Sequence, residues 1–506
     1  MSNDEQWEKQ LEQLPLGHGG FTVQSMNKIK ERIRMNQSSG RRSIRITVAT
    51  AAILLTGVIA WALSRGEQPG QKTALSMIDE TEGQLIVEYW DSQSFMGQIG
   101  QPYLIRHPNM KLKVATLPSE ISQRYDWNSY KEWMVESAVD VVQVPLAYID
   151  DLAKDGAIVP LDNLLELGGI DLSEMYQPML ELAREAGGGK LYALPDQFNL
   201  ELLYYNKTLF QSHNVPLPEA GDTWDDIFRL AERFAGATAT NGRPVYGLSI
   251  GWRSNPYSAI SKIGRAQGLS LVDAKGMPQV NSEAWQALWR QATEGLAKGW
   301  INNEPGPEAT GNGWTEQSMI EADPFINNRS AMSFQSYSAW STLSKAGDQG
   351  LFSGDWDVLP ISSNAASPGI TSSYSGGLLY AINAKSPNRD QAMQLIESIV
   401  SKERAEREYA SGIFSLHANR PSSLTVLNDP ADRFYATRLD AASILEQFER
   451  NQLPGVIEMS SALNAIGNES TEAIIAGRST VEDTLAHMQE EAERIIHSAR
   501  GSGANP

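Results

Sequence analysis

The run Gly247-Leu-Ser-Ile-Gly251 comes nearest to a catalytic nucleophile in residue type and spacing. Its G-x-S-x-G pattern matches the strand-to-helix elbow that presents the serine of α/β-hydrolases, whose triad needs a later acid and histidine. A strand-like segment precedes the run, but Trp252, Arg253 and Pro256 follow, so no helix is predicted to begin at the serine. The downstream histidines have no supporting motif. We predict that the chain is not an enzyme and keep a hydrolase built on Ser249 as a minor alternative.

Metal and phosphate chemistry also lacks suitable spacing. The chain has no cysteine, which excludes disulfides, thiolate zinc sites and a lipid anchor on cysteine. In Gly187-Gly-Gly-Lys190 the glycine spacing is not that of a P-loop, and Leu191 stands where Ser or Thr would reach magnesium. The histidines form no H-E-x-x-H, and Asp150, Asp151 and Asp155 lack the spacing of an EF-hand. We therefore expect a tight turn at the glycines, and neither a metal nor a cofactor.

Short apolar runs alternate with helical segments from residue 84 onward. Strands are predicted at 85–90, 111–117 and 139–144, and helices at 98–107 and 147–155. This alternation predicts βα units around a mostly parallel sheet, so the fold class is α/β. Further helices are predicted at 223–234, 278–299, 389–411 and 461–497. Thr223 and Asp226 form a capping box at the start of the first of these, and Gly467 and Gly477 are expected to interrupt the last.

One apolar run, residues 46–63, is long enough to cross a bilayer. Eighteen helical residues span roughly 27 Å, close to the thickness of the hydrocarbon core. Residues 22–45 carry seven basic side chains against one acid, so the positive-inside rule places the N-terminus in the cytoplasm. The predicted order is a cytoplasmic basic segment (1–43), a transmembrane helix (44–64) and a linker (65–83). A cleaved signal peptide is the alternative, although the stretch before the apolar run is longer than a usual basic region.

The charge distribution separates the two sides of this helix. Residues 1–72 hold ten basic and six acidic groups, which leaves 32 basic against 55 acidic beyond them, a net charge of −23. A surface this acidic repels phosphate backbones, so no nucleic-acid partner is expected. At 506 residues the chain is long enough for two or three domains.

Six stretches occur in the order and spacing of a family of exported proteins. They are Val139-Asp-Val-Val142; Gly156-Ala-Ile-Val-Pro-Leu-Asp162; Gly189-Lys-Leu-Tyr-Ala-Leu-Pro195; Leu202-Leu-Tyr-Tyr-Asn-Lys207 with Thr223-Trp-Asp225; Asn328-Arg-Ser-Ala-Met332 with Trp340; and Gly376-Gly377 with Leu379-Tyr-Ala-Ile382 and Ser386-Pro-Asn388. From residue 84 to 500 the chain resembles the extracellular solute-binding proteins of ABC importers, of the family 1, maltose and multiple-sugar type. The helical tether and the cytoplasmic extension depart from that family's pattern.

The resemblance implies a periplasmic-binding-protein-like fold, with two α/β lobes, a hinge and a ligand cleft between the lobes. One lobe would comprise 84–199 and 376–425, and the other 200–375 and 426–500. The chain would cross between them near 198–202, 374–377 and 420–430. Closure of such a hinge around a ligand would stabilise the closed form.

A sugar site needs aromatic platforms together with carboxylate and amide partners. Trp90 and Asp91 stand at the carboxyl end of the first predicted strand, where α/β sheets bind ligands, although Trp90 in the core is an alternative. Trp252 and Arg253 follow another predicted strand. The resemblance adds Asp196, Gln197 and Asn199 at the first crossover, Gln335, Tyr337 and Trp340 after a later strand, and Tyr374 at the second crossover. The three crossover residues would otherwise be part of the hinge surface.

The expected function is non-catalytic: the membrane-anchored protein captures a small solute, a sugar or oligosaccharide, outside the cell and delivers it to an ABC importer. The expected partners are a sugar or oligosaccharide and an ABC permease in the membrane. The alternative is a ligand sensor that signals through the cytoplasmic segment to a cytoplasmic regulator. The expected location is the cell membrane, with a single pass and the binding domain outside.

Overall fold

The computed structural model describes residues 81–124, 127–168, 170–251, 255–304, 315–363, 365–413, 415–422 and 429–502. The predicted cytoplasmic segment, the apolar run 46–63 and nearly all of the predicted linker lie outside these residues, as do Trp252 and Arg253. No helix in the described part of the chain combines the length and the apolar content needed to cross a membrane.

Lobe 1 is built on a five-stranded sheet in the order β2-β1-β3-β11-β4. Its strands are β1 (Gly83–Glu88), β2 (Met110–Ala115), β3 (Val141–Pro145), β4 (Ala193–Pro195) and β11 (Leu378–Ile382). β1 pairs in parallel with β2 and β3, whereas β11 is antiparallel to β3 and β4. The sheet is therefore mixed, because the strand that returns from the other lobe enters it in the opposite direction.

Helices pack against this sheet through side chains of the first hydrophobic core. They are α4 (Ser92–Phe95), the π-helix η2 (Met96–Gly100), α5 (Gln101–Arg106), α6 (Ser119–Arg124), α7 (Trp127–Glu136), the 3-10 helix η3 (Leu146–Tyr148), α8 (Ile149–Lys154), α9 (Asp162–Gly168), α10 (Gln177–Ala186) and α17 (Arg389–Ile399). A further helix of this lobe, α18 (Lys402–Ala410), follows α17 in the chain. Leu85, Val87 and Val142 are fully buried in that core, as expected for strands covered on both faces.

Lobe 2 is built on a six-stranded sheet in which β10, β5, β7 and β6 are neighbours and β8 and β12 also pair with β5. Its strands are β5 (Gln197–Asn206), β6 (Tyr246–Ser249), β7 (Ser330–Ser336), β8 (Trp356–Leu359), β10 (Tyr374–Gly376) and β12 (Leu416–His417). A separate two-stranded pairing joins β9 (Ile370–Thr371) and β13 (Arg438–Leu439).

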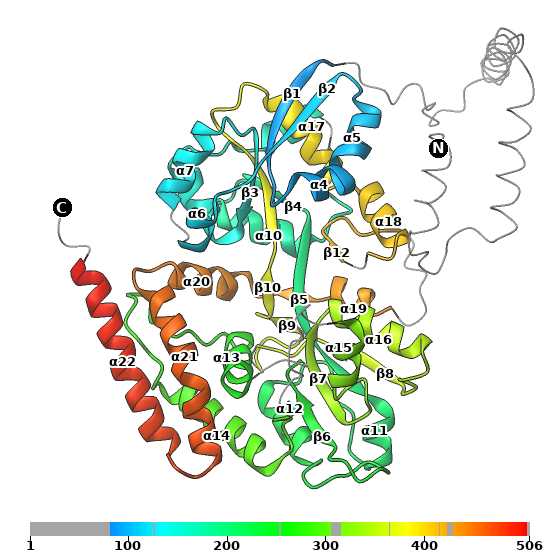
Figure 1. Cartoon of the computed structure of the whole chain (residues 1–506), viewed down its shortest axis with the longest axis vertical. Helices are drawn as coiled ribbons and strands as arrows, with labels where there is room; N and C mark the ends of the chain where they lie inside the picture. The colour runs from blue at the N-terminus through cyan, green and yellow to red at the C-terminus, as the bar shows by residue number, and fades with distance from the viewer. Residues whose placement is uncertain are drawn as a thin grey trace, which may run out of the picture. The chain divides into compact units, whose positions relative to one another are not determined.

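The helices of lobe 2 include the long C-terminal pair α21 and α22, which lie along one side of the lobe (Figure 1). The full set is α11 (Lys207–Ser212), α12 (Trp224–Glu232), α13 (Pro256–Ala266), α14 (Glu283–Lys298), α15 (Glu316–Ala322), α16 (Ser338–Asp348), α19 (Ala431–Tyr435), α20 (Ala441–Asn451), α21 (Val456–Ile475) and α22 (Val481–Ser502). Many of their buried side chains belong to the second hydrophobic core.

Local sequence signals explain several of these boundaries. Thr223 caps α12 together with Asp226, as the predicted capping box requires. Gly477 lies just beyond α21 in a left-handed conformation (φ +69°), whereas Gly467 lies inside that helix. The expected break at Gly467 was wrong because the residue serves close packing: a Cβ there would come within 2.3 Å of the Tyr257 ring.

Strands β5 and β10 lead from one lobe to the other (Figure 1). β4 ends at Pro195 in the sheet of lobe 1, and β5 begins two residues later and extends into lobe 2. The chain returns through β10 and Gly377 into β11. A Cβ on Gly377 would lie 2.7 Å from the Gln197 carbonyl oxygen, so glycine permits the two connecting segments to pass closely.

Candidate functional site

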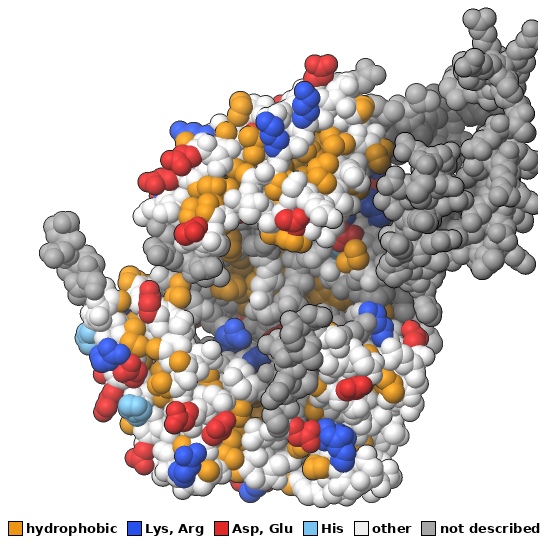
Figure 2. Space-filling model, viewed as in Figure 1, with side chains coloured by type: hydrophobic (Ala, Val, Ile, Leu, Met, Phe, Trp, Pro, Cys, Tyr) orange, Lys and Arg blue, Asp and Glu red, His pale blue; other side chains and the backbone are white. Residues whose placement is uncertain are grey.

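A cavity of about 530 Å³ lies where these connecting segments meet the two lobes. Its volume is within the range of small-molecule sites. Lobe 1 and lobe 2 both contribute to its lining, and Figure 2 shows a groove between them on one face. The lining residues are Tyr89, Trp90, Gln98, Gln143, Asp196, Gln197, Phe198, Asn199, Tyr337, Ser338, Ser375, Gly376, Gly377, Tyr380, Arg404, Ser415 and Leu416.

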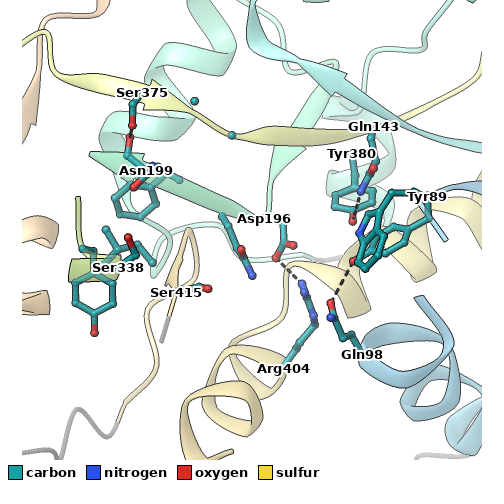
Figure 3. A pocket seen from close by; sticks show the side chains of 17 residues that line it. Tyr89, Gln98, Gln143, Asp196, Asn199, Ser338, Ser375, Tyr380, Arg404 and Ser415 are labelled. Carbon is teal, nitrogen blue, oxygen red and sulfur yellow. Dashed lines mark hydrogen bonds and ion pairs between the residues drawn. The ribbon is translucent and has the colours of Figure 1, made fainter. Parts of the chain in front are cut away.

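Aromatic rings form much of this lining. Trp90 follows β1 and keeps 62% of its surface exposed, with its ring centroid 5.6 Å from that of Tyr89. The Tyr89 hydroxyl donates to Gln98 Oε1 at 3.1 Å. Gln143 Nε2 donates to the Tyr380 hydroxyl at 2.7 Å (Figure 3). The cavity therefore offers apolar faces edged by amide and hydroxyl groups, the combination that a polyhydroxylated ring requires.

A buried charged cluster underlies the cavity. It consists of Asp196, Arg404, Glu408 and His417, which come from the first crossover, α18 and β12. Arg404 Nη1 donates to Asp196 Oδ1 at 2.5 Å, and Arg404 Nε lies 2.8 Å from Glu408 Oε1. Asp196 and Arg404 reach the cavity wall (Figure 3). Such a cluster is stable only while each charge keeps its partners, since a lone buried charge is costly.

The electrostatics of the cluster follow from this pairing. Burial alone would raise the pKa of Asp196, but the neighbouring Arg404 and His417 outweigh it and lower that pKa. Burial alone would lower the pKa of His417, but Asp196 and Glu408 raise it above its ordinary value. The carboxylate is thus held ionised and the imidazole favours its protonated form.

Another buried carboxyl group, that of Glu88, supports the wall of the cavity from behind. Glu88 Oε2 accepts from the Tyr130 hydroxyl at 2.6 Å and from the backbone N–H of Gln143 at 3.0 Å. Burial raises the pKa of Glu88 to about 7, although both hydrogen bonds oppose this rise. Glu88 therefore links β1 to the part of β3 that carries Gln143 into the cavity.

A further carboxylate, that of Asp429, connects the two lobes beside the cavity. Asp429 accepts from Tyr337 of lobe 2 at 3.0 Å and from Tyr409 of α18 in lobe 1 at 2.6 Å. One carboxylate thus holds a hydroxyl group from each side, which ties the position of α18 to that of the cavity-lining Tyr337.

Five of the residues proposed from the sequence line the cavity. These are Trp90, Asp196, Gln197, Asn199 and Tyr337. Three of them are on the first crossover, where β4 ends and β5 begins, so their positions follow directly from the passage of the chain between lobes.

Asp91 and Trp340 are placed elsewhere. Asp91 is the N-cap of α4, and its Oδ1 accepts from the Ser94 amide nitrogen at 2.8 Å, so the side chain turns toward the helix. Trp340 is only 1% exposed, because it lies on the inner face of α16 with its ring stacked 6.1 Å from that of Tyr337. These two residues contribute a helix cap and core packing to the described structure.

Gln335 and Tyr374 also lie outside the main cavity. Gln335 is buried on β7, where its amide donates to Ser333 Oγ at 2.7 Å and to Asp323 Oδ2 at 3.1 Å. It lines an adjoining cavity of about 470 Å³ that shares Ser338 with the main one. Tyr374 is buried edge-on against Phe448. Trp252 and Arg253 lie outside the described residues.

Several lining residues are not among those proposed from the sequence. Gln98 comes from the π-helix, Gln143 and Tyr380 from adjacent strands, and Arg404 from a helix two hundred residues distant from Asp196 in the sequence. Only Tyr89 had a sequence signal, namely its position beside Trp90 at the end of a strand. The others depend on tertiary pairing.

Ser249 is not placed as a nucleophile. Its side chain is fully buried on β6, and its hydroxyl donates to Ser333 Oγ at 2.9 Å on the neighbouring strand β7. A hydrolase elbow instead exposes its serine at a turn. Within the described residues, no group of three or more His, Cys, Asp and Glu side chains could hold a metal ion.

Two α/β lobes with a ligand-sized cavity at their crossovers define a periplasmic-binding-protein-like fold. The chain belongs to the bacterial extracellular solute-binding protein family, whose model matches residues 133–431. The sn-glycerol-3-phosphate-binding periplasmic protein UgpB of Rhizobium meliloti is 28% identical over 102 residues, a match that covers 20% of this chain and only 23% of that protein.

Solved structures show the same fold. The sugar-binding protein MalE from Xanthomonas citri is 14% identical with a TM-score of 0.57, covering 84% of this chain and 100% of that one. A sugar transporter from Rhizobium etli in an open conformation is 19% identical with a TM-score of 0.54, covering 82% of this chain and 100% of that one. At these identities the likeness establishes the fold alone.

Proposed function

We propose that this chain captures a sugar or oligosaccharide between its lobes and delivers it to an ABC importer, without catalysing a reaction on it. The observation that carries the proposal is the cavity at the crossovers, where exposed Trp90 and the rings of Tyr89, Tyr337 and Tyr380 lie beside amide and carboxylate groups. Stacking on such rings together with hydrogen bonds to hydroxyls is the recognition that sugars need.

The comparisons support this proposal without establishing the ligand. The Xanthomonas citri and Rhizobium etli proteins are described as a sugar-binding protein and a sugar transporter. The two lobes proposed from the sequence, 84–199 with 376–425 and 200–375 with 426–500, would close about the crossovers. A ligand that contacts both lobes would favour the closed form by its additional contacts there.

A titration of tryptophan fluorescence tests the binding proposal. The purified full-length chain, with detergent present, is titrated with maltose, glucose, mannitol and longer oligosaccharides. We expect saturable binding of at least one of them, weakened at least about tenfold by Trp90→Ala, since one aromatic stacking platform is removed. Asp162→Asn is the matched control, because Asp162 pairs with Arg184 in lobe 1 outside the cavity. Unchanged affinity in Trp90→Ala would move the ligand away from this cavity.

The proposed setting is the outer face of a cell membrane. The apolar run 46–63, preceded by seven basic residues, supports a single transmembrane helix at 44–64 with the segment 1–43 in the cytoplasm. Protease added to intact cells should then degrade the binding domain and leave the N-terminal segment protected. Release of the binding domain by salt or alkaline washing would contradict the anchor.

The basic cytoplasmic segment supports a second candidate, a sensor that reports the bound ligand to a cytoplasmic regulator. Met26, Ile29 and Ile33 would share one face of a helix there, with basic residues on the other. Deleting residues 1–40 separates the two functions. Delivery of a sugar should survive this deletion, whereas signalling should be lost.

A further inference from the structure

We propose that the cavity selects uncharged polyhydroxy ligands and excludes phosphate esters, because its described cation, Arg404, is committed to the buried carboxylates Asp196 and Glu408. This inference rests on the proposed function and adds the chemical class of the ligand. It also assigns the selectivity to the charged cluster of Asp196, Arg404, Glu408 and His417. These side chains contact one another, and not all of them need to contact the ligand.

The guanidinium of Arg404 is buried beside two carboxylates, Asp196 and Glu408. The side chain is 3% exposed. Its Nη1 donates both to Asp196 Oδ1 at 2.5 Å and to the Ile399 carbonyl oxygen at 2.9 Å, and its Nε lies 2.8 Å from Glu408 Oε1. Recognition of phosphate by arginine uses this same fork of N–H donors. A phosphate group would therefore compete with two buried carboxylates for this guanidinium.

His417 completes the neutralisation of the cluster. Its Nδ1 lies 3.5 Å from Asp196 Oδ1 and its Nε2 lies 3.1 Å from Glu408 Oε2, so both ring nitrogens face carboxylate oxygens. A neutral imidazole has a single N–H donor, whereas the imidazolium ion has two. Although burial opposes it, Asp196 and Glu408 raise the pKa of the ring, and in its protonated form two cations balance two carboxylates.

The rest of the described lining adds no available cation. Among the described residues, Arg404 is the only lysine or arginine that lines the main cavity. Lys262 lines the adjoining cavity, where its Nζ lies 2.7 Å from Glu201 Oε1. Asp429 adds a carboxylate behind Tyr337. A phosphate entering here would lose hydration without gaining an unpaired positive partner, which is strongly unfavourable.

The ligand chemistry inferred for this chain differs from that in the names of relatives that it matches over a short segment. Those relatives are named for binding sn-glycerol-3-phosphate, an anionic ligand, and the match covers 23% of the length of the Rhizobium meliloti protein. The committed state of Arg404 predicts a different ligand chemistry for this chain. The difference can be measured on compounds that differ only in a phosphate group.

The test uses matched neutral and phosphorylated compounds with the purified full-length chain. Calorimetric titrations compare glycerol with sn-glycerol-3-phosphate and glucose with glucose 6-phosphate, and add maltose and mannitol as further neutral probes. We expect at least one neutral compound to bind, and phosphorylated compounds to bind at least about a hundredfold more weakly than the best neutral one. A phosphate ester that binds as tightly as, or more tightly than, every neutral probe would overturn the inference and leave solute binding intact. Binding of none of the probes would contradict both proposals.

Two variants test the residues. Asp196→Asn and Glu408→Gln each remove one carboxylate from Arg404. Each should therefore reduce the ratio of the dissociation constants of phosphorylated and neutral compounds, called the gap below, by about tenfold to a hundredfold, the worth of one charge-assisted hydrogen bond. Asp162→Asn, which removes the carboxylate from an Arg–Asp pair outside the cavity, should leave the gap unchanged. If Asp196→Asn does not fold, Glu408→Gln and the wild-type selectivity still decide. An unchanged gap in a folded Glu408→Gln variant would refute the role of the cluster.

Discussion

Replacing Glu88 by glutamine should make the protein more stable at alkaline pH. Glu88 is 6% exposed and its pKa is raised from the ordinary value of 4.5 to about 7 by burial. The folded chain therefore holds a proton on Glu88 that the unfolded chain releases between these two pH values, so the contribution of Glu88 to stability is greatest below pH 4.5 and declines as the pH rises through about 7. One pKa unit corresponds to about 1.4 kcal/mol, and the whole decline therefore amounts to about 3 kcal/mol.

Glutamine removes this decline while keeping the contacts. The side-chain carbonyl oxygen of glutamine can accept from the Tyr130 hydroxyl and from the backbone N–H of Gln143, as the Glu88 carboxyl does. Urea unfolding followed by tryptophan fluorescence at pH 4.5 and pH 8.5 gives the change in unfolding free energy with pH for each protein. Glu88→Gln should lose about 3 kcal/mol less than the wild type between the two pH values.

The comparison between pH values cancels any constant cost of the amide. Glu185→Gln is the matched control, since Glu185 is an exposed glutamate near the end of α10. It should retain the wild-type dependence on pH. The reasoning is refuted if Glu88→Gln loses as much stability as the wild type between pH 4.5 and pH 8.5.

Three further predictions concern residues around the cavity. Trp340→Ala should lower the unfolding free energy, measured in urea, by about 3–5 kcal/mol, because a fully buried ring is lost. Trp90→Ala should change the unfolding free energy by less than about 0.5 kcal/mol, because its ring is exposed. Equal effects of the two substitutions would contradict the assigned burial. Tyr409→Phe removes the hydrogen bond to Asp429 and should cost about 1.5–3 kcal/mol in the same assay, and no cost would show that the contact contributes nothing. Ser249→Ala should leave sugar binding unchanged in a fluorescence titration, since its hydroxyl lies inside a sheet; loss of an esterase activity in this variant would revive the hydrolase alternative.

Local patterns in the sequence were sufficient for the parts of the fold that depend on neighbouring residues. The alternation of strands and helices in 84–155 predicted β1, β2 and β3, and Thr223 with Asp226 predicted the start of α12. The family resemblance placed the first crossover just after the motif that ends at Pro195, and Asp196, Gln197 and Asn199 lie where β4 ends and β5 begins.

The position of a side chain relative to the cavity could not be obtained in this way. The interior residues of β7 are buried on both faces of the strand, so the alternation of apolar and polar residues does not show which side chains face a cavity. Gln335 was therefore proposed as a site residue without knowledge of the direction of its side chain. Trp340 and Trp90 are the same residue type, and only tertiary packing buries the first and exposes the second. Asp91 did carry a local signal, because an aspartate three residues before Ser94 is a typical helix cap.

The charged cluster was the least accessible part of the site. Asp196 is about two hundred residues from Arg404 and His417 in the sequence and meets them only because β12 pairs with β5 and α18 packs beneath the first crossover. No motif marks Arg404 as part of a cavity. Its role depends on partners that the fold brings together.

Thermal unfolding of the full-length chain in the presence of single compounds tests the central claim most directly. A ligand that binds the folded state at a hundred times its dissociation constant should stabilise the chain by about 2.7 kcal/mol and raise the melting midpoint. We predict such a rise with at least one neutral sugar or oligosaccharide, reduced in Trp90→Ala and retained in Asp162→Asn. A midpoint that no sugar raises would contradict the claim that the cavity between the lobes is a sugar-binding site.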